Sequence, residues 1–357
     1  MNGERYLRQT TLRDFGSGAQ KRLSKAKVLV VGAGGLGAPV LTYLNAMGVG
    51  TLGIVDGDIV SLSNLHRQVL FDEGDVGRSK VRSVAQKLKA QNSDTYCILH
   101  DTFLSRENAL EIIAPYDVVV DASDNFATRY LVNDACVIRN KPFVYGALHG
   151  FEGQLSVFNH ANGPTYRCLF PEMPGPDAVP NCDENGVLGV IPGIVGNLQA
   201  LETVKVITGV GEVLSGKVLL FDGLSLNTRT VRFSKNPKNS NIKKLETCYD
   251  WDCGTVMKSI SVKDFKALRK SRSVQLIDVR TSKEYEDAHL KDSLNIPLGD
   301  LEARITEIDF NDPVYVLCQS GKRSAKAIAQ LQKGNPKATL INIEGGMDNR
   351  KGHATKC

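Results

Sequence analysis

A glycine-rich turn near the N-terminus has the residue types and spacing of a phosphate-binding loop. The segment 32–37 reads GAGGLG and follows an apolar run at 28–31. Its glycines fit the spacing G-x-G-x-x-G, in which bare backbone N–H groups at the start of a helix bind phosphate oxygens. Asp56 ends the next apolar run, about 20 residues further on, where a carboxylate accepts hydrogen bonds from ribose hydroxyls. We therefore expect a nucleotide site at this turn.

Three further charged residues favour one nucleotide chemistry over another. A dehydrogenase holds a pyrophosphate without breaking it, and it has little use for several cations and a metal-binding carboxylate there. This chain has Arg67 and Lys80, which can neutralise a triphosphate and a departing pyrophosphate, and Asp124, which can bind Mg²⁺. Each residue alone could be a solvated surface charge. Their joint position after strands favours activation by ATP, and an NAD-dependent oxidoreductase is the alternative.

A second set of residues, near the C-terminus, is suited to sulfur chemistry. Cys318 follows an apolar run at 314–317 and opens the segment CQSGKRS at 318–324. A thiol at a strand end, ringed by N–H groups at a helix N-terminus and beside two cations, should form a thiolate and can carry an anionic persulfide. A phosphatase of related design needs Cys-x₅-Arg, whereas Arg323 comes one residue early. Sulfur transfer is therefore favoured over phosphate hydrolysis and over an inactive domain.

The other cysteines differ in their surroundings. Eight Cys in 357 residues, with no export signal, are expected to be reduced thiols. Cys97 and Cys136 have apolar neighbours and are expected to be buried. Cys182 lies in a polar stretch beside Asp183 and Glu184, which disfavour its thiolate. An incidental loop thiol is the alternative for Cys182.

The elements that must position these residues follow from the hydrophobic pattern. Strands are expected at 28–31, 51–55, 118–120, 274–279 and 314–317, with helices at 38–47, 80–90, 189–208 and 324–332. Strands that alternate with helices predict a parallel, doubly wound α/β sheet. Ligands bind such sheets at the carboxyl ends of the strands, which is where Asp56, Asp124 and Cys318 fall.

Length and composition predict two domains. The chain has 357 residues, with 44 Lys and Arg against 39 Asp and Glu, so its net charge is only +5. We place one domain at 1–235, a polar linker at 236–256 and a smaller α/β domain at 257–357. The charge is too dilute for nucleic-acid binding, and no apolar run reaches the roughly 18 residues of a membrane span. A cytoplasmic protein is expected.

Residues 5–233 closely resemble the adenylyltransferases that activate ubiquitin-like sulfur carriers in molybdopterin and thiamine biosynthesis. The matching segments are RYLRQ at 5–9, GAGGLG at 32–37, VDGD at 55–58, SNLHRQ at 63–68, DASDN at 121–125, YRCLFP at 166–171 and GVLGV at 186–190. The resemblance implies a Rossmann-like fold. It also implies that ATP adenylates the C-terminal glycine of a carrier ending in Gly-Gly. The motifs do not say which pathway's carrier is used.

The same resemblance implies roles for individual residues. The implied ATP-binding residues are Gly35, Asp56, Ser63, Asn64, Arg67, Lys80, Asp124 and Asn125. Asp124 and Asn125 would face Mg²⁺. Arg8 would reach across a homodimer to the partner's ATP. Cys182 matches a position where some relatives carry a thiol that accepts the activated acyl group or joins a disulfide.

Residues 257–346 resemble a rhodanese domain. The matching segments are LIDVR at 276–280, EY at 284–285, HL at 289–290, NIP at 295–297, the Cys318 loop and EGGM at 344–347. The resemblance implies a Cys318 persulfide, loaded by a donor such as a cysteine desulfurase, that turns the activated carrier into a thiocarboxylate. A persulfide-binding scaffold without catalysis is a further alternative.

Relatives of the first domain often bind structural zinc through two Cys-x-x-Cys pairs, and this chain departs from that pattern. Thr165 stands where the first pair would begin, before Cys168, and Cys248 and Cys253 are separated by four residues. A tetrahedral four-cysteine site lacks its local pairs here, so zinc is doubtful. Cys168 is then expected to be a plain core thiol.

Overall fold

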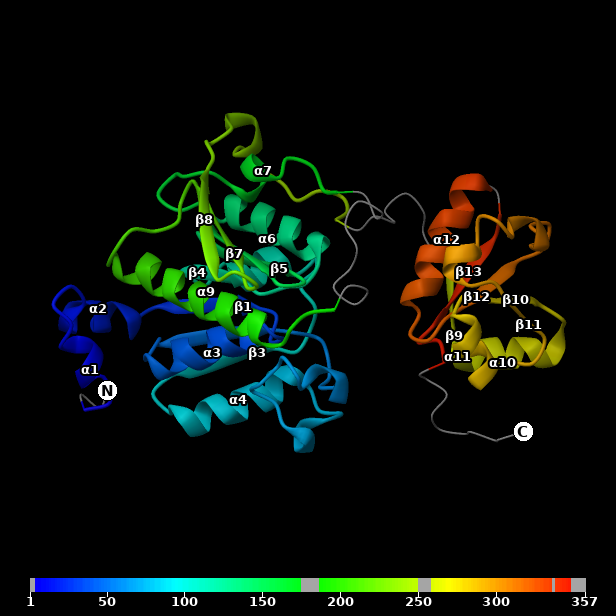
Figure 1. Ribbon diagram of the computed structural model, residues 1–357, viewed down its shortest axis with the longest axis horizontal. Coiled ribbons are helices and arrows are strands. Elements are labelled where there is room, and N and C mark those ends of the chain that lie inside the picture. Colours follow the sequence, from blue (N-terminus) through cyan, green and yellow to red (C-terminus); the bar gives the residue numbers. More distant parts are fainter. Residues whose placement is uncertain (1–3, 175–185, 250–257, 336–337, 348–357) are drawn as a thin grey trace. The chain divides into compact units, whose positions relative to one another are not determined.

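The computed structural model describes residues 4–174, 186–249, 258–335 and 338–347, and the chain divides into two units, 1–251 and 252–357 (Figure 1). Cys182 therefore lies outside the described residues. The predicted linker is not free along its whole length. Tyr249 is buried in the first unit, and its hydroxyl donates to Asp134 Oδ2 at 2.8 Å. A polar stretch can pack in this way when its side chains find buried partners.

The first unit contains an eight-stranded sheet in the order β3-β2-β1-β4-β5-β6-β7-β8. Its strands are β1 (Lys27–Val31), β2 (Thr51–Val55), β3 (Tyr96–His100), β4 (Val118–Asp121), β5 (Phe143–His149), β6 (Glu152–Phe158), β7 (Lys217–Asp222) and β8 (Asn227–Arg232). The first five strands in this order are parallel, which confirms the doubly wound sheet. β6 to β8 extend it antiparallel, because short turns such as the one after β5 can join only antiparallel neighbours.

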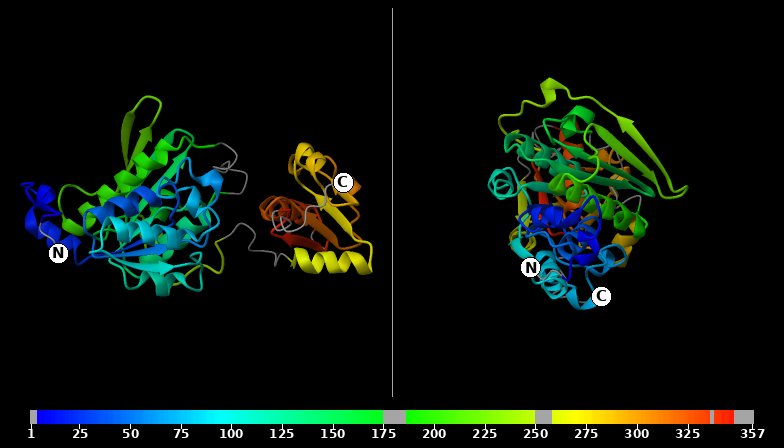
Figure 2. Two further views of the ribbon diagram at one scale, coloured as in Figure 1. Left: turned by 90° about the horizontal axis from the view of Figure 1, so that it is seen from below. Right: turned by 90° about the vertical axis from the view of Figure 1, so that its left-hand side faces the viewer.

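Helices cover both faces of this sheet (Figures 1 and 2). They are α1 (Leu7–Thr10), α2 (Gly16–Leu23), α3 (Gly37–Ala46), α4 (Lys80–Gln91), α5 (Ala109–Ile113), α6 (Phe126–Ile138), α7 (Tyr166–Leu169) and α9 (Val190–Thr208), with short 3-10 turns at η1 (Leu62–Asn64), η2 (Glu73–Asp75) and η3 (Pro237–Asn239). In β1, Val28 and Val30 pack with α2, α3, α4 and α9, whereas Leu29 and Val31 pack with α5, α6 and α7. This alternation buries the strand on both faces.

Helix α9 has an unusually apolar composition. Among the described helices it alone has the length and hydropathy of a membrane span, with a mean hydropathy of 1.2, and half of it is buried inside the protein. Val195, Ala200 and Val204 belong to the core beneath the sheet. Helix α9 is therefore apolar because it packs in this core.

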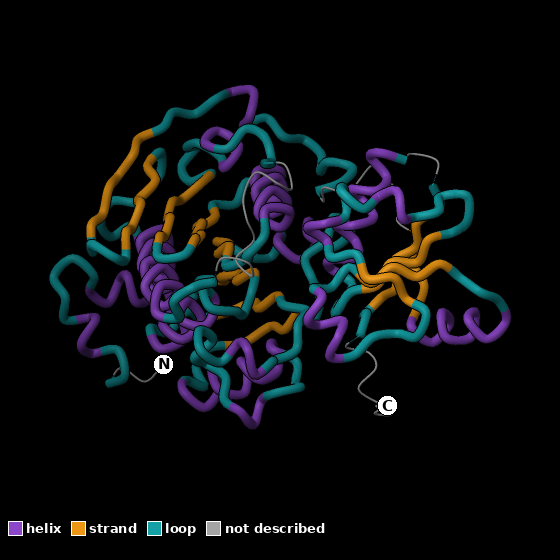
Figure 3. Tube along the Cα trace, turned by 45° about the vertical axis from the view of Figure 1, so that its right-hand side comes forward, coloured by secondary structure: helices purple, strands orange, loops and turns teal. Residues whose placement is uncertain are grey.

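The second unit contains a smaller sheet with helices around it (Figure 3). The sheet is parallel, with the strand order β11-β10-β12-β13-β9. Its elements are β9 (Lys258–Ser261), α10 (Val262–Ser271), β10 (Gln275–Asp278), α11 (Ser282–Asp287), β11 (Ser293–Asn295), η4 (Leu298–Asp300), η5 (Ile305–Glu307), β12 (Val314–Leu317), α12 (Lys322–Gly334) and β13 (Leu340–Glu344). Helix α12 packs on one face and α10 on the other. The expected second α/β domain is confirmed, and β12 places Cys318 at the centre of the sheet's carboxyl edge.

Candidate functional site

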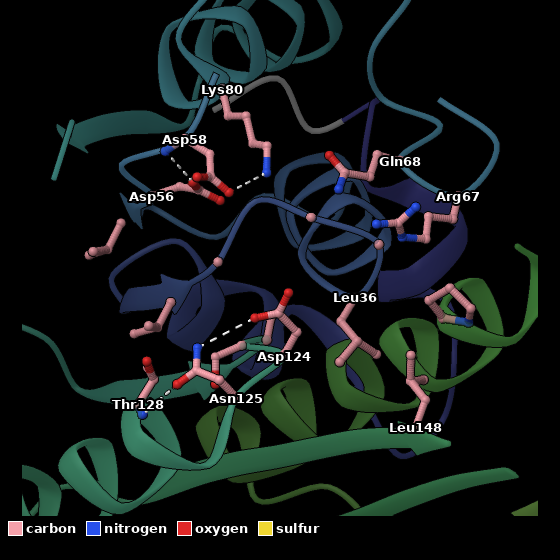
Figure 4. A pocket seen from close by; sticks show the side chains of 18 of the residues that line it. Leu36, Asp56, Asp58, Arg67, Gln68, Lys80, Asp124, Asn125, Thr128 and Leu148 are labelled. Atoms are coloured by element: carbon pink, nitrogen blue, oxygen red, sulfur yellow. Dashed lines mark hydrogen bonds and ion pairs between the residues drawn. The ribbon is translucent and has the colours of Figure 1, made fainter. Parts of the chain in front are cut away.

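A cavity of about 360 Å³ opens at the carboxyl ends of β1, β2 and β4 in the first unit (Figure 4). Six of the predicted ATP-binding residues line it: Gly35, Asp56, Arg67, Lys80, Asp124 and Asn125. Ser63 and Asn64 are absent from its lining. Arg8 is also absent and is exposed on α1. The parallel strands bring the six residues together because their carboxyl ends meet at one edge.

The glycine loop has a shape that only glycine allows at two positions. Gly32 has φ +99°, and a Cβ there would lie 2.7 Å from the Ala122 carbonyl oxygen. A Cβ at Gly37 would lie 2.0 Å from the Gly32 carbonyl oxygen, so α3 can begin this close to β1 only with glycine. Gly35 faces Pro192 near the start of α9, and a Cβ added to Gly35 would lie 3.1 Å from the Pro192 Cβ. The loop thus presents bare backbone at the start of α3, which is the arrangement that binds phosphate groups in other proteins.

Asp56 is held firmly at the end of β2. Its Oδ2 accepts from the Ala33 N–H at 2.9 Å, and its Oδ1 accepts from the Asp58 N–H at 2.8 Å. Burial raises the pKa of Asp56, while Lys80 and the two N–H groups oppose that rise. Each carboxylate oxygen keeps a lone pair, so the group can still accept from ribose hydroxyls.

Lys80 and Arg67 are both positioned by neighbouring oxygen atoms. Lys80 begins α4 with its side chain 6% exposed, and its Nζ lies 2.9 Å from Asp58 Oδ2. Arg67 donates through Nη1 to the Ser63 carbonyl oxygen at 3.1 Å, and its N–H donates to the Asn64 carbonyl oxygen at 3.1 Å. Ser63 and Asn64 therefore hold Arg67 in place and do not themselves face the cavity.

Asp124 and Asn125 differ in their hydrogen bonds. The Asn125 Oδ1 accepts from the Thr128 N–H at 2.8 Å, which caps α6 and leaves this oxygen a second lone pair. Asp124 is exposed, and its carboxylate borders the cavity. Nearby, Asp121 is buried and its Oδ2 has no partner among the described residues. Burial raises the pKa of Asp121, which Arg129 opposes. Carboxylate oxygens are the ligands that Mg²⁺ prefers, so the exposed carboxylate of Asp124 is suited to this ion.

Sequence reasoning missed Arg129 and Gln68, which also line the cavity. Arg129 is buried, with its guanidinium 5.3 Å from the centre of the Phe126 ring and 5.7 Å from that of Tyr145. Gln68 is buried beside Gly34. One feature of the sequence could have indicated Arg129. It is a cation that follows the acidic segment 121–125, at the end of a strand, by about one helical turn.

Cys318 lies in a closed loop at the end of β12. Its Sγ accepts from the Gly321 N–H at 3.1 Å and lies 3.4 Å from Ser324 Oγ. Its carbonyl oxygen accepts from the Met347 N–H at 3.0 Å, and a Cβ at Gly346 would lie 2.2 Å from that oxygen. Among the described residues, one backbone N–H and one hydroxyl thus lie against the sulfur, whereas a ring of N–H groups was expected.

Of the two cations predicted beside Cys318, Arg323 forms an ion pair with Glu284. The side chain of Lys322 lies outside the described residues. Arg280, which sequence reasoning did not assign to the site, also reaches the loop, since its Nη1 lies 3.5 Å from Gln319 Oε1.

Two expectations about the cysteines were wrong. Cys248 is disulfide-bonded, whereas all thiols were expected to be reduced, because composition does not show which thiols meet in space. Cys168 is not a plain core thiol. It is half-buried, and its Sγ accepts from the Asn236 N–H at 3.2 Å and from the Thr165 N–H at 3.4 Å. Burial alone would raise the pKa of Cys168, but hydrogen bonds from Thr165, Asn236 and Ser240 together lower it.

The remaining described thiols have apolar surroundings. Cys136 is buried, as expected, whereas Cys97 is only half-buried and not buried as expected; burial raises the pKa of both thiols. No group of three or more His, Cys, Asp or Glu side chains that could hold a metal ion occurs in the described part of the chain.

The fold and the site define an adenylate-forming enzyme whose phosphate loop is not a P-loop, followed by a smaller α/β domain with Cys318 in a loop at the carboxyl edge of its sheet. The chain belongs to the ThiF family, which it matches over residues 6–244, and it matches the rhodanese-like domain over residues 261–352. It is an adenylyltransferase and sulfurtransferase by class, which replaces the NAD-dependent oxidoreductase considered above.

Two relatives match nearly the whole chain. Adenylyltransferase and sulfurtransferase MOCS3 of Arabidopsis thaliana is 42% identical, over 96% of this chain and 82% of its own length. "Probable adenylyltransferase/sulfurtransferase MoeZ" of Mycobacterium tuberculosis is 40% identical, over 96% of this chain and 91% of its own. Among solved structures, E. coli MccB with ATP has a TM-score of 0.59 at 22% identity, covering 67% of this chain and 73% of MccB, which shows a shared fold.

Proposed function

We propose that the first unit uses ATP to adenylate the C-terminal glycine of a ubiquitin-like sulfur carrier, and that Cys318 then supplies the sulfur of a thiocarboxylate. The observation that carries the first step is the meeting of Arg67, Lys80 and Asp124 around the glycine cradle in one cavity. Two cations there can stabilise the charge that develops on a departing pyrophosphate. The cradle and Asp56 would orient the α-phosphate towards the attacking carboxylate.

Mg²⁺ fits the acidic side of this cavity. Asp124 would hold it, and the ion would supply charge neutralisation to the triphosphate. Asn125 would face the same ion, because its amide oxygen keeps a second lone pair while it caps α6. Arg67 and Lys80 would bind the phosphates from the opposite side, each kept in place by the oxygen atoms described above.

Sulfur transfer follows at the second unit. The terminal sulfur of a Cys318 persulfide attacks the acyl carbon and displaces AMP, and reduction of the acyl disulfide by thiols leaves the thiocarboxylate and the Cys318 thiol. A cysteine desulfurase is the proposed source of the persulfide, and Cys182 the proposed second thiol. The names of the relatives favour a molybdopterin-synthase type of carrier, with the thiamine-pathway carrier as the alternative.

The two steps can be tested separately. We expect Cys318→Ser to retain ATP–pyrophosphate exchange and to lose thiocarboxylate formation, because Cys318 belongs to the second unit. Arg67→Ala should lower exchange by about 100-fold or more, since it removes a cation from the phosphate site. Exchange is measured with each Gly-Gly-ended carrier in turn, which also identifies the carrier. Unaltered thiocarboxylate yield in Cys318→Ser would contradict the coupled mechanism.

A further inference from the structure

The sheet of the second unit is covered unequally on its two faces. On one face, α12 and the 3-10 turns η4 and η5 pack on the strands, whereas among the described helices only α10 adds side chains to the core on the other face. A cleft of about 410 Å³ lies beside α10 on this second face. The apolar side chains that line it are Val262, Phe265, Leu290, Leu317, Ile343 and Met347.

One rim of this cleft is basic. Lys266, Arg269 and Lys270 line it, and none of the described lining residues carries a carboxylate. The guanidinium of Arg269 is engaged, since it donates to the Lys291 carbonyl oxygen and lies 3.5 Å from Asp292 Oδ2. Lys266 and Lys270 are exposed, and neither has a hydrogen-bond or ion-pair partner in the described part of the chain. Two unpaired ammonium groups therefore border an apolar space.

The positive charge continues along the outer side of α10. Lys263 lies on the same stripe of the helix as Lys266 and Lys270, because residues three, four and seven apart share one face. Asp264, the one carboxylate of this helix, is engaged by Ser261 Oγ at 2.7 Å. The lysine stripe, defined as these three lysines, is about 10 Å long, so a row of carboxylates matches it better than a single one.

The residues that follow Met347 have the wrong composition for this cleft. The segment 348–357 reads DNRKGHATKC, with three Lys or Arg, one Asp and no large apolar side chain. Its charge has the same sign as that of the rim, and it offers little to bury in an apolar space. The chemistry of the cleft is instead matched by a partner that combines large apolar side chains with carboxylates.

The cleft adjoins the Cys318 loop without enclosing its sulfur. Leu317 and Met347 line the cleft; Leu317 precedes Cys318, and the Met347 N–H donates to the Cys318 carbonyl oxygen at 3.0 Å. Side chains alternate along β12, so Leu317 packs on the α10 side of the sheet and Cys318 on the α12 side. A molecule in the cleft would be held beside the reacting loop and away from the sulfur. This is the position of a docking surface and not of a substrate pocket.

Of the two proteins that exchange sulfur in the proposed function, the donor has the greater need of a surface here. The carrier is held at the first unit through its adenylated C-terminus, whereas the donor reacts only with Cys318. We infer that the cleft and the lysine stripe of α10 dock the protein that donates the persulfide, through a segment with large apolar side chains beside a row of carboxylates. This inference rests on the proposed function, and it adds where the donor protein is held.

The docked donor reacts by thiol–disulfide exchange. The Cys318 thiolate attacks the outer sulfur of the donor's persulfide, and a new S–S bond to Cys318 forms. The donor's own S–S bond breaks, and its electron pair leaves on the donor's cysteine thiolate. A small persulfide undergoes the same reaction without a docking surface, so the two kinds of donor separate docking from chemistry.

The test reverses the charge of the stripe in the full chain and measures sulfur transfer as thiocyanate formed with cyanide. In Lys266→Glu/Lys270→Glu, we expect KM for a persulfide-loaded cysteine desulfurase to rise by about tenfold or more, with kcat within about twofold, because like charges then face each other. Transfer from glutathione persulfide should change by less than about twofold, which also shows that the variant is folded. Lys243→Glu/Lys244→Glu is the matched control, since it makes the same change in net charge at two exposed lysines of the first unit.

High salt should raise the wild-type KM for the desulfurase and leave that for glutathione persulfide nearly unchanged, because exposed charges are screened. An unchanged KM for the desulfurase in Lys266→Glu/Lys270→Glu, an equal rise in the control, or an equal loss with glutathione persulfide would overturn this inference alone. A rise in KM for the carrier in place of the desulfurase would assign the surface to the carrier and overturn it as well. Absence of sulfur transfer from both donors in the wild type would overturn the proposed role of Cys318, and this inference with it.

Discussion

At the scale of single residues, the cations of both sites are held by the protein's own oxygen atoms. Lys80 contacts Asp58, Arg67 contacts the Ser63 carbonyl, and Arg323 contacts Glu284. Such contacts limit the motion of long side chains, so less conformational entropy is lost when a phosphate or persulfide binds. They also make the charge of each site depend on the ionisation of its carboxylates.

The pair of Glu284 and Arg323 makes the second unit sensitive to acid. Hydrogen bonding from Arg323 lowers the pKa of Glu284 from 4.5 to about 2. A lowered folded-state pKa stabilises the fold above the ordinary value, and this contribution is lost as the pH falls from about 4.5 towards 2. Both side chains are about one-third exposed, so the contribution should be about 1 kcal/mol or less.

Hydrogen-exchange mass spectrometry of the full chain can measure this contribution within the second unit. We expect Glu284→Gln to exchange faster than the wild type around its loop at pH 6–7, with a difference that shrinks below pH 4.5. A difference of constant size across that range would show that the pair's charge is not its cause.

At the scale of elements, the start of α3 determines whether the phosphate loop can form. Gly37 allows the first turn of this helix to approach β1, because no Cβ meets the Gly32 carbonyl. At Gly34, by contrast, an added Cβ would meet only the tip of the Gln68 side chain, at 3.4 Å. Gly37 and Gly34 belong to one motif, but only at Gly37 would an added Cβ meet backbone atoms. The packing therefore requires glycine at 37 and not at 34.

This contrast predicts different outcomes for two similar substitutions. Gly37→Ala should destabilise the first unit by about 2–3 kcal/mol or more and abolish ATP–pyrophosphate exchange, because backbone must move to admit the methyl group. Gly34→Ala should retain the fold, since a flexible side chain can shift. Urea unfolding and exchange assays on the full chain measure both effects. Equal destabilisation by the two substitutions would refute this explanation of the loop.

At the scale of the whole molecule, the adenylation site of one chain leaves Arg8 unused. Arg8 is exposed on α1 and does not line the cavity of its own chain. If two copies form a homodimer in which each Arg8 completes the partner's site, defects in different subunits should complement one another. A residue exposed on a short N-terminal helix is suited to such a contact.

Mixing Arg8→Ala with Lys80→Ala, after dissociation and reassembly, tests this arrangement. Each variant alone should be inactive in ATP–pyrophosphate exchange. Half of the reassembled dimers would be mixed and would contain one intact site, so about a quarter of wild-type exchange should return. Failure to recover activity in verified mixed dimers would place Arg8 outside the site.

Much of this protein could be predicted from local sequence. The glycine loop, Asp56, Asp124 and Cys318 each follow an apolar run. Carboxyl ends of parallel strands share one edge, so these positions could be assigned to sites without coordinates. The local pattern could not show which residues that lie far apart in the sequence contact one another. Arg323 and Glu284 are 39 residues apart, and Tyr249 packs on Asp134 across 115 residues.

The sequence by itself therefore determined the two α/β domains, their order, and which loops carry the chemistry, because hydrophobic periodicity and glycine spacing act over a few residues. Only the tertiary structure decided that Ser63 and Asn64 support Arg67, that Arg129 borders the cavity from within α6, and that Glu284 forms an ion pair with Arg323. These contacts depend on how distant elements pack, and packing is a property of the whole fold.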